Sequence, residues 1–454
     1  MIDEISYVDF GDKRLNRRFR LIIKKLTAKP SVSIPQACGN WAFTKAVYRF
    51  LNSSKVKPEI IRNAHIASTV ERIKSYDTIL AVQDTTNINF TRHPATKGLG
   101  ILDSKFAYGL KCHSCLAVTT EGVPMGLLHQ EVWVRDKDSV GKKYTRDKRP
   151  IEEKESRRWI TTIERIEKEV PDKTQVIVVG DRESDIYELF AAPRRQGIEL
   201  LVRGYHNRRV KDEEKKLWKV MNKTKPRGKI KVGLRKKDGN PSRKAVLEVR
   251  YQMVEILPPK KHPNKPSLKT IELYVVTARE KYPPKGKKGI NWLLVTTIEI
   301  KSLDDAVKII GWYTLRWIIE RYHYTLKSGC KIEELQLETA DRLERASAIY
   351  CIVAWRLLWL TYEARKNPDA PCTLVLESYE WKALYCFCNK TRKPPPKPPT
   401  LSESVRLIAK LGGFLGRKGD RHPGVKTIWR GLRRLNDISL MYLMMNGEKD
   451  VGNG

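Results

Sequence analysis

The sequence has few cysteines and no long apolar run. Only two pairs among its eight cysteines lie close together, Cys112 with Cys115 and Cys386 with Cys388, so neither a disulfide framework nor a multi-cysteine zinc module is expected. The most apolar long stretch, residues 346–360, contains an arginine and is shorter than the roughly 20 residues that a membrane span needs. We therefore expect a buried helix there and no membrane partner.

Acidic residues are scarce relative to basic ones. The chain has 52 Asp and Glu against 88 Lys and Arg, which leaves a formal net charge of +36. The basic residues are spread over several segments rather than along one amphipathic helix, so the surplus favours nucleic acid over a membrane surface as partner. A solvated basic surface is the alternative. The first ten residues lack the basic and then apolar order of a targeting signal, which predicts a cytoplasmic protein.

Composition divides the 454 residues into three parts, as the length also suggests. Residues 1–70 are basic and helical in pattern, residues 71–370 alternate apolar strands with helices, and residues 371–454 are helical again. Basic strand-like segments with Gly and Pro turns occupy residues 204 to about 300. The expected fold class is therefore α/β, with a mixed sheet, a β insertion and a helical domain on each side.

One short segment combines two cysteines with a histidine. Cys112, His113 and Cys115 lie in KCHSCLAVTT, which alternates like a β-strand. Because successive side chains of a strand point to opposite faces, Cys112 and Cys115 would face away from each other. Ordinary strand packing is therefore favoured over a metal site.

Two aspartates each follow a short apolar run. Asp84 ends TILAVQD and Asp181 ends TQVIVVGD, which predicts a carboxylate at a strand end next to a loop, where functional sites are often built. Either residue alone could be a helix cap or a turn residue. Glu183 and Asp185 are nearby substitutes for Asp181.

A third acidic residue belongs to a polar stripe on a helix expected from about residue 303 to residue 329. Tyr313, Arg316, Glu320 and Lys327 have offsets of 0, 3, 7 and 14, which places them within roughly a 60° arc of one continuous helix. Glu320 could simply pair with Arg316 on a solvated face. The helix is also rich in apolar residues that would anchor it, so a fixed stripe is favoured. Its carboxylate suits a divalent cation, and its basic groups suit phosphates.

These motifs resemble the IS4-family DDE transposases, specifically the Tn5-like group. The resemblance rests on Asp84 in QDTT, Asp181 in GDRESD and the Tyr-2-Arg-3-Glu-6-Lys spacing of the stripe. Further similar stretches follow in the same order along nearly the whole chain: GDKRLNRR at 11–18, AVYRFL at 46–51, GLLHQEVWVR at 126–135, EKES at 153–156, NWLLVTT at 291–297 and LGGFLGRKGD at 411–420.

The resemblance implies a fold and a reaction. The fold is a ribonuclease H-like mixed-sheet catalytic core over residues 71–370 with the β insertion, flanked by a DNA-binding domain (1–70) and a dimerisation domain (371–454). The implied reaction is cut-and-paste transposition, in which metal-dependent hydrolysis nicks the transposon end, a hairpin forms and is resolved, and the 3′ end joins target DNA. A catalytically silent end-binding regulator and a ribonuclease H-like nuclease acting on RNA are the alternatives.

The implied partners are DNA and a second copy of the chain. The double-stranded DNA comprises transposon ends and target, a homodimer forms the synaptic complex, and no small-molecule cofactor is expected. The protein would act in the cytoplasm of a bacterium, at the nucleoid.

The resemblance also assigns site residues. Asp84, Asp181 and Glu320 are implied as catalytic residues and as ligands of two Mg²⁺ ions, for which Mn²⁺ can substitute. We expect the surrounding positive charge to keep the three acids ionised without metal. The implied DNA contacts are Tyr313, Arg316, Lys327, Arg203, Trp292, Arg14, Arg18 and Arg49.

Two positions carry open questions. The resemblance makes Trp292 the receptor for a base flipped out of the duplex during hairpin formation, whereas its place at the start of an apolar strand is also typical of a core residue. The best-studied relative has a lysine four residues after the catalytic glutamate, but this chain has Tyr324. Contacts to phosphate or to the flipped base are therefore expected to differ there.

Overall fold

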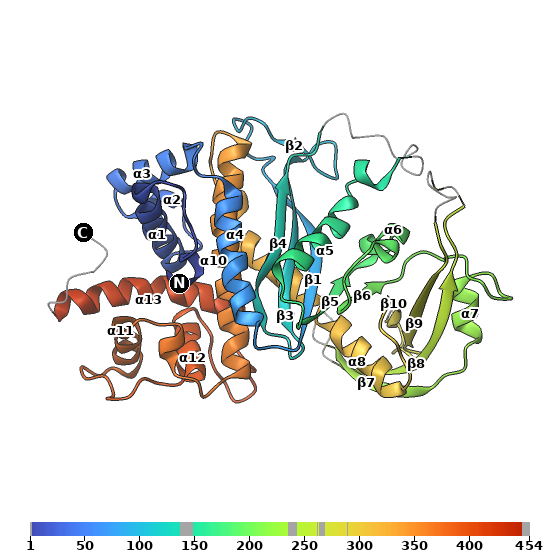
Figure 1. Cartoon of the computed structure of the whole chain (residues 1–454). Coiled ribbons are helices and arrows are strands. Elements are labelled where there is room, and N and C mark those ends of the chain that lie inside the picture. Colours follow the sequence, from blue (N-terminus) through green and yellow to red (C-terminus); the bar gives the residue numbers. More distant parts are fainter. Residues whose placement is uncertain are drawn as a thin grey trace.

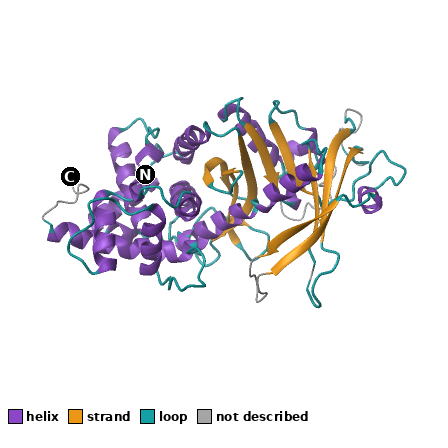
Figure 2. Cartoon of the chain, turned by 90° about the horizontal axis from the view of Figure 1, so that it is seen from below, coloured by secondary structure: helices purple, strands orange, loops and turns teal. Residues whose placement is uncertain are grey.

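A mixed β-sheet with helices around it forms the centre of the chain (Figures 1 and 2). The computed structural model describes residues 2–136, 149–234, 243–260, 262, 268–287 and 289–446. Part of the expected β insertion and residues 447–454 of the expected C-terminal domain therefore lie outside the described residues. In the part that is described, no helix is both long and apolar enough to cross a bilayer.

The N-terminal helices pack around phenylalanines. They are η1 (Ile2–Ile5), α1 (Lys13–Ala28), α2 (Ile34–Cys38), α3 (Trp41–Asn52) and α4 (Pro58–Ile73). Asp12 caps α1, because its side chain accepts a hydrogen bond from Arg14 N at 2.9 Å. The rings of Phe10, Phe19 and Phe50 lie 5.5–5.9 Å apart, and these contacts join the chain before α1 to α1 and α3.

In the described residues the sheet contains ten strands in the order β2-β3-β1-β5-β6-β10-β9-β8-β7, with β4 paired to β3. β1, β5 and β6 are parallel neighbours, and β3 and β10 run antiparallel on either side of them. The strands are β1 (Thr78–Asn89), β2 (Gly100–Ile101), β3 (Tyr108–Thr119), β4 (Pro124–Trp133), β5 (Gln175–Gly180), β6 (Ile198–Arg203), β7 (Gly228–Leu234), β8 (Arg243–Ile256), β9 (Ile271–Arg279) and β10 (Asn291–Thr296).

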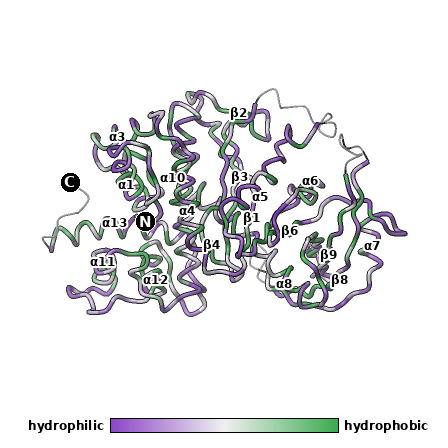
Figure 3. Tube along the Cα trace, viewed as in Figure 1, coloured by the Kyte–Doolittle hydropathy of each residue, from purple (hydrophilic) through white to green (hydrophobic). Residues whose placement is uncertain are grey.

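Both faces of the central strands are buried. Along β1, Leu80 and Val82 join the larger core, whereas Ile79 and Ala81 join a second core on the opposite face. Hydrophobic residues gather along the strands and inner helices, and the peripheral loops are hydrophilic (Figure 3). Burial on both faces explains why the central strands are near-continuous apolar runs in the sequence. The mixed α/β architecture predicted from the sequence is confirmed.

The insertion strands extend the same sheet. β10 pairs with β6 of the core on one side and with β9 on the other, and β8 and β7 follow. The inserted strands are thus a continuation of the core sheet rather than a separate β unit.

Helices cover the sheet. They are α5 (Arg157–Glu169), α6 (Tyr187–Ala191), α7 (Leu217–Lys223), α8 (Leu303–Thr314), α9 (Trp317–Tyr324) and α10 (Ala340–Lys366). Short helical turns are η4 (Ile151–Glu153), η5 (Arg182–Ser184), η7 (Thr325–Gly329), η8 (Ile332–Glu334) and η9 (Cys372–Leu374). The predicted buried helix over residues 346–360 is confirmed as the middle of α10.

The expectation of one continuous helix from about residue 303 to 329 is wrong. Between α8 and α9 the backbone hydrogen bonds join residues three apart instead of four, as in the bond from Arg316 N to Tyr313 O at 3.1 Å. After α9 the chain widens into the π-helical turn η7. One turn is tighter and one is wider than an α-helix, so the 100° spacing used to align the polar stripe does not hold along its whole length.

The C-terminal helices form a third core. They are α11 (Ser378–Asn389), α12 (Leu401–Leu411) and α13 (Val425–Met445). Leu360 and Ala364, near the end of α10, belong to this core, whereas most of α10 belongs to the core beside the sheet. Figure 1 shows α10 and α4 standing between the sheet and both groups of terminal helices.

A glycine lets α4 approach the sheet, and its replacement should be destabilising. Gly126 in β4 has φ +147°, and a Cβ there would lie 2.0 Å from Thr69 Oγ1. We expect Gly126→Ala to lower the free energy of unfolding by about 1–3 kcal/mol through overpacking, measured by urea denaturation. Gly233→Ala is the control, because a Cβ at that position meets nothing within 4 Å. Equal stability of the two variants would contradict this account of the close contact.

Candidate active site

The two aspartates lie at matching positions on neighbouring parallel strands. The parallel pairing of β1 with β5 ends at Val82 and Val179, so Asp84 and Asp181 each come two residues beyond it. Asp181 follows the end of β5, as predicted. Asp84 does not end its strand, because β1 continues to Asn89 by pairing with β3. That prediction was wrong because the antiparallel partner extends the strand beyond the reach of β5.

Backbone groups hold both carboxylates. Thr85 N donates to Asp84 Oδ1 at 2.9 Å, and Glu183 N donates to Asp181 Oδ1 at 2.8 Å. The buried Ser184 hydroxyl donates to the carbonyl oxygen of Asp181 at 2.7 Å, which closes the η5 turn. Both side chains are therefore oriented by local hydrogen bonds.

The structure also separates Asp181 from its substitutes. Asp185 is only 1% exposed and pairs with Arg208 at 2.5 Å, and its other carboxylate oxygen accepts two backbone N–H groups. A carboxylate with these partners already serves a structural purpose. Glu183 is exposed at the surface of η5. Asp181 remains the stronger candidate.

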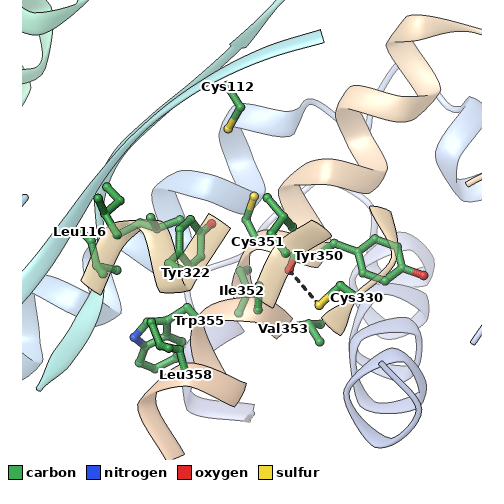
Figure 4. Packing of buried hydrophobic residues seen from close by; sticks show 14 of the residues in the cluster. Cys112, Leu116, Tyr322, Cys330, Tyr350, Cys351, Ile352, Val353, Trp355 and Leu358 are labelled. Atoms are coloured by element: carbon green, nitrogen blue, oxygen red, sulfur yellow. Dashed lines mark hydrogen bonds between the residues drawn. The ribbon is translucent and has the colours of Figure 1, made fainter. Parts of the chain in front are cut away.

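Glu320 is carried by a helix that is fixed in the core. Tyr322, two residues later, is fully buried, and its hydroxyl accepts a hydrogen bond from Gln130 Nε2 at 3.2 Å. Figure 4 shows Tyr322 between β3, with Cys112 and Leu116, and α10, with Cys351 and Trp355. Because α9 is held on this side, the opposite side that carries Glu320 has a defined position.

The electrostatics of Asp84 contradict the expectation that all three acids stay ionised. Burial raises the pKa of Asp84 to about 7, and the neighbouring charge of Asp181 and, more weakly, of Glu320 adds to the rise, against the opposing effect of Arg316. The side chain is 18% exposed. The distant positive charges do not offset the loss of water and the nearby like charges. Three carboxylates therefore share one corner of the fold.

Arg316 is the counter-ion within this corner. Its guanidinium donates to Glu320 Oε1. Burial opposes the charge of Arg316, but Tyr313 and Glu320 more than compensate and raise its pKa. The pairing that was considered as a solvated alternative thus exists, although the Arg316 side chain is only 14% exposed.

Aromatic and basic side chains continue the site beyond Arg316. The rings of Trp292 and Tyr313 meet edge to face at 5.8 Å, and the Arg203 guanidinium lies 5.8 Å from the first ring and 6.0 Å from the second. Burial raises the pKa of Tyr313 and lowers that of Arg203. Trp292 is half-buried. The structure therefore brings Arg203 and Trp292 together with Tyr313 and Arg316, although these four residues lie on three separate segments of the sequence.

The remaining candidates lie farther out. Lys327 is in the η7 turn, where its Nζ lies 3.8 Å from a carboxylate oxygen of Glu333. Arg14 and Arg18 are in α1 and Arg49 is in α3, on the other side of α4 and α10 from the sheet (Figure 1). These three arginines are not part of the acidic corner.

Sequence reasoning missed one residue of the site. His323, on α9, is 6% exposed, and its Nδ1 lies 3.7 Å from Asp84 Oδ2. Burial lowers its pKa to about 3, so the ring is neutral at physiological pH. The only signal in the sequence was its position three residues after Glu320.

The donor set fits a hard divalent cation. Asp84, Asp181 and Glu320 offer only oxygen atoms, which are the ligands that Mg²⁺ and Mn²⁺ prefer. The pKa of Asp84 is raised first by burial and then by the neighbouring acids, and a cation would relieve that second effect. In this conformation, no group of three or more His, Cys, Asp or Glu side chains among the described residues is arranged so that it could hold a metal ion. The bond from Arg316 occupies Glu320 in this conformation.

The Cys-His-Cys segment is packing, as its alternation favoured. Cys112 and Cys115 belong to the two cores on opposite faces of the sheet. His113 bonds to Thr85 Oγ1 at 2.8 Å and to Gln83 Oε1 at 3.0 Å. It thus supports β1 beside Asp84.

Comparison with known families matches three segments of the chain. Residues 1–56 match the model described as Transposase DNA-binding, residues 150–356 match the Transposase DDE domain, and residues 352–441 match the Transposase Tn5 dimerisation domain. The DDE match contains Asp181 and Glu320 but begins after Asp84.

Fold, acidic corner and matches together define a DDE transposase with a ribonuclease H-like core, a divalent-metal-dependent enzyme that cleaves DNA. The chain belongs to the Tn5-like group of the IS4 family. DNA and a second copy of the same chain are its partners.

Because the pKa of Asp84 is raised, replacing this residue should change the stability of the protein in a pH-dependent way. The folded protein keeps a proton on Asp84 up to about pH 7, whereas an unfolded chain releases it near pH 4. The contribution of Asp84 to the stability of the metal-free protein should therefore fall as the pH rises from about 4 to 7. We expect Asp84→Asn to raise the Tm in EDTA at pH 8 relative to wild type, with little gain at pH 4.

The measurement is a Tm series from pH 4 to 8. Asp172→Asn is the control, because the Asp172 side chain is 92% exposed and its replacement should leave the profile unchanged. A gain for Asp84→Asn that is the same at every pH would contradict the assignment of the raised pKa to Asp84.

Proposed function

We propose that this transposase moves a DNA element by cut-and-paste transposition through hairpin ends, with Asp84, Asp181 and Glu320 as its catalytic acids. The observation that carries the proposal is the shared corner of three carboxylates beside Arg316. An open site beside basic and aromatic groups suits an extended substrate. Two cavities of about 750 and 500 Å³ in the described part of the chain are lined by other residues.

Two Mg²⁺ ions, or Mn²⁺ in their place, are the cations we assign to the three carboxylates. When bound, such ions activate the attacking oxygen and stabilise the leaving oxygen. To act as a ligand, Asp84 must give up the proton that its raised pKa retains near neutral pH. Glu320 must likewise turn at least one oxygen away from Arg316.

The chemistry proceeds in direct phosphoryl transfers without a protein–DNA bond. Water attacks the phosphorus at the transposon end, the P–O3′ bond breaks, and the 3′ oxygen leaves as a hydroxyl. That 3′-OH then attacks the opposite strand, displaces the 3′ oxygen of the flanking DNA and closes a hairpin. A second water opens the hairpin, and the restored 3′-OH attacks target DNA in the same way.

Basic and phenolic groups hold the phosphates. Arg316, released from Glu320, and Lys327 grip phosphates beside the cleaved bond, and the hydroxyl of Tyr313 donates to another. Arg203, which lies over the rings of Trp292 and Tyr313, adds a further cation. The half-buried Trp292 ring receives the flipped base by stacking.

Recognition of the transposon end begins in the N-terminal domain of the partner copy. Arg14 and Arg49 are exposed and Arg18 is half-exposed, and α4 and α10 separate all three from the acids of their own chain (Figure 1). We assign residues 1–70 to end binding, 71–370 to catalysis and 371–454 to dimerisation, with the protein acting at the bacterial nucleoid.

Glu320→Gln tests the catalytic proposal. The substitution keeps the shape of the side chain but removes its charge. We expect the affinity for a transposon-end duplex to stay within about threefold, because phosphate contacts dominate binding, and the Mg²⁺-dependent nick to slow by about a hundredfold or more. Single-turnover cleavage, resolved on a denaturing gel, measures the cutting of each strand. Glu338→Gln is the control, because the Glu338 side chain is 78% exposed.

The outcomes separate the alternatives. Nicking by Glu320→Gln at the wild-type rate would remove Glu320 from the site. Wild-type protein that binds but does not cut in Mg²⁺ or Mn²⁺ would indicate a silent regulator. Preferential cleavage of an RNA–DNA hybrid would indicate a nuclease.

Trp292→Ala tests the base receptor. Base–aromatic stacking contributes about 1–3 kcal/mol, so we expect hairpin formation to slow by roughly 5- to 150-fold while the first nick keeps its rate. Trp218→Ala, at a half-exposed tryptophan on α7, is the matched control. Hairpins at the wild-type rate would return Trp292 to a packing role.

A further inference from the structure

Helix α9, which carries Glu320, is followed by an unusual turn. In η7 the N–H of Cys330 donates to the carbonyl oxygen of Thr325 at 2.9 Å, an i→i−5 bond, and the next residue, Lys331, has φ +52°. π turns are rare and commonly mark functional positions. This one contains Lys327, for which the proposed function gives a phosphate contact.

A tryptophan from α13 fills the space beside this turn. A Cβ on Gly329 would lie 2.8 Å from Trp429 Cε3, closer than real Cβ contacts allow. The rings of Tyr324 and Trp429 lie 5.8 Å apart at 45°, and Trp429 is 4% exposed. Two sides of the turn thus rest on one indole ring.

Trp429 connects the C-terminal helix to the catalytic core. Along α13, Val425 and Trp429 belong to the core beside the sheet, whereas Ile428 and Leu435 belong to the C-terminal core. The same helix lies within the segment that matches the dimerisation domain for all but its last residues. A single stiff element therefore contacts both the dimerisation region and the end of the catalytic helix.

Tyr324, which stands where the best-studied relative has a lysine, takes part in the contact with Trp429. Tyr324 lies between Trp429 and the guanidinium of Arg321, which is 5.2 Å from the Tyr324 ring centre. A lysine there would place a charge against the indole ring instead of a second aromatic ring. In this chain the contact between α9 and α13 at this position is therefore one aromatic ring against another.

We propose that Trp429 is a positioning residue that holds the π turn and thereby directs Lys327, so that the dimerisation helix supports the geometry of the active site. The inference rests on the proposed function of Lys327. Without the indole ring the turn can relax toward α-helical hydrogen bonding, which would change the direction of Lys327. The effect is expected on cleavage rather than on DNA binding.

Trp429→Phe tests the inference in the full-length protein. We expect affinity for the end duplex, dimer mass by sedimentation and Tm to stay close to wild type, and the first nick to slow by about ten- to a hundredfold through misplacement of Lys327. Trp381→Phe is the matched control: Trp381 is equally buried at 5% but lies in the C-terminal core. It should nick at the wild-type rate.

A double-mutant cycle with Lys327→Ala tests whether Trp429 acts on cleavage through Lys327. If Trp429 acts through Lys327, the double variant should nick about as slowly as Lys327→Ala alone. The inference would be overturned if the two rate reductions multiplied in the double variant, or if Trp429→Phe nicked at the wild-type rate. A wild-type rate for Lys327→Ala would refute the phosphate role given to Lys327 above, and this route with it, but would leave the Glu320 result unaffected.

A second variant covers the case in which Trp429→Phe folds poorly. Gly329→Ala presses a methyl group against the same ring from the side of the turn. It should slow the nick by a similar factor and likewise add little to Lys327→Ala. An unaffected rate would overturn the inference.

Discussion

The fold must hold three like-charged carboxylates in one partly buried corner. Asp84 and Asp181 come two residues beyond the last pair of the parallel strands β1 and β5, and Glu320 approaches from α9. Burial, and then the charges of the other two acids, raise the pKa of Asp84 to about 7, so the corner is costly without a cation. Only a rigid surrounding structure can keep it, and the two cores on either face of the sheet provide that rigidity.

Helix α10 links the three functional parts of the chain. Its middle belongs to a core that runs from Phe19 of α1 to the central strands, and its end, at Leu360 and Ala364, belongs to the C-terminal core. The DDE and dimerisation matches overlap within this helix. DNA binding, cleavage and dimerisation thus depend on shared packing, and α13 adds a second link at Trp429.

Much of the site could be predicted because its residues lie in strongly patterned segments. Asp84 and Asp181 follow apolar runs long enough to be buried strands, and the spacing from Tyr313 to Lys327 resembles a family motif. The break at Arg316 and the π turn after Tyr324 could not be predicted, because both depend on hydrogen bonds selected by packing against the sheet and α13. Strand pairing beyond Asp84 and the extension of the sheet by β9 have the same long-range origin.

The sequence by itself determined the composition of the site: an excess of positive charge, two aspartates after apolar runs and a glutamate on a helix, and the motifs of the Tn5-like group. These are local properties, carried by residue type and spacing. Tertiary structure alone decided the protonation of Asp84, the meeting of Trp292 with Tyr313, and the contact of Trp429 with the turn that follows α9. Each of these joins residues through space, where burial and neighbouring charge outweigh what any single segment prefers.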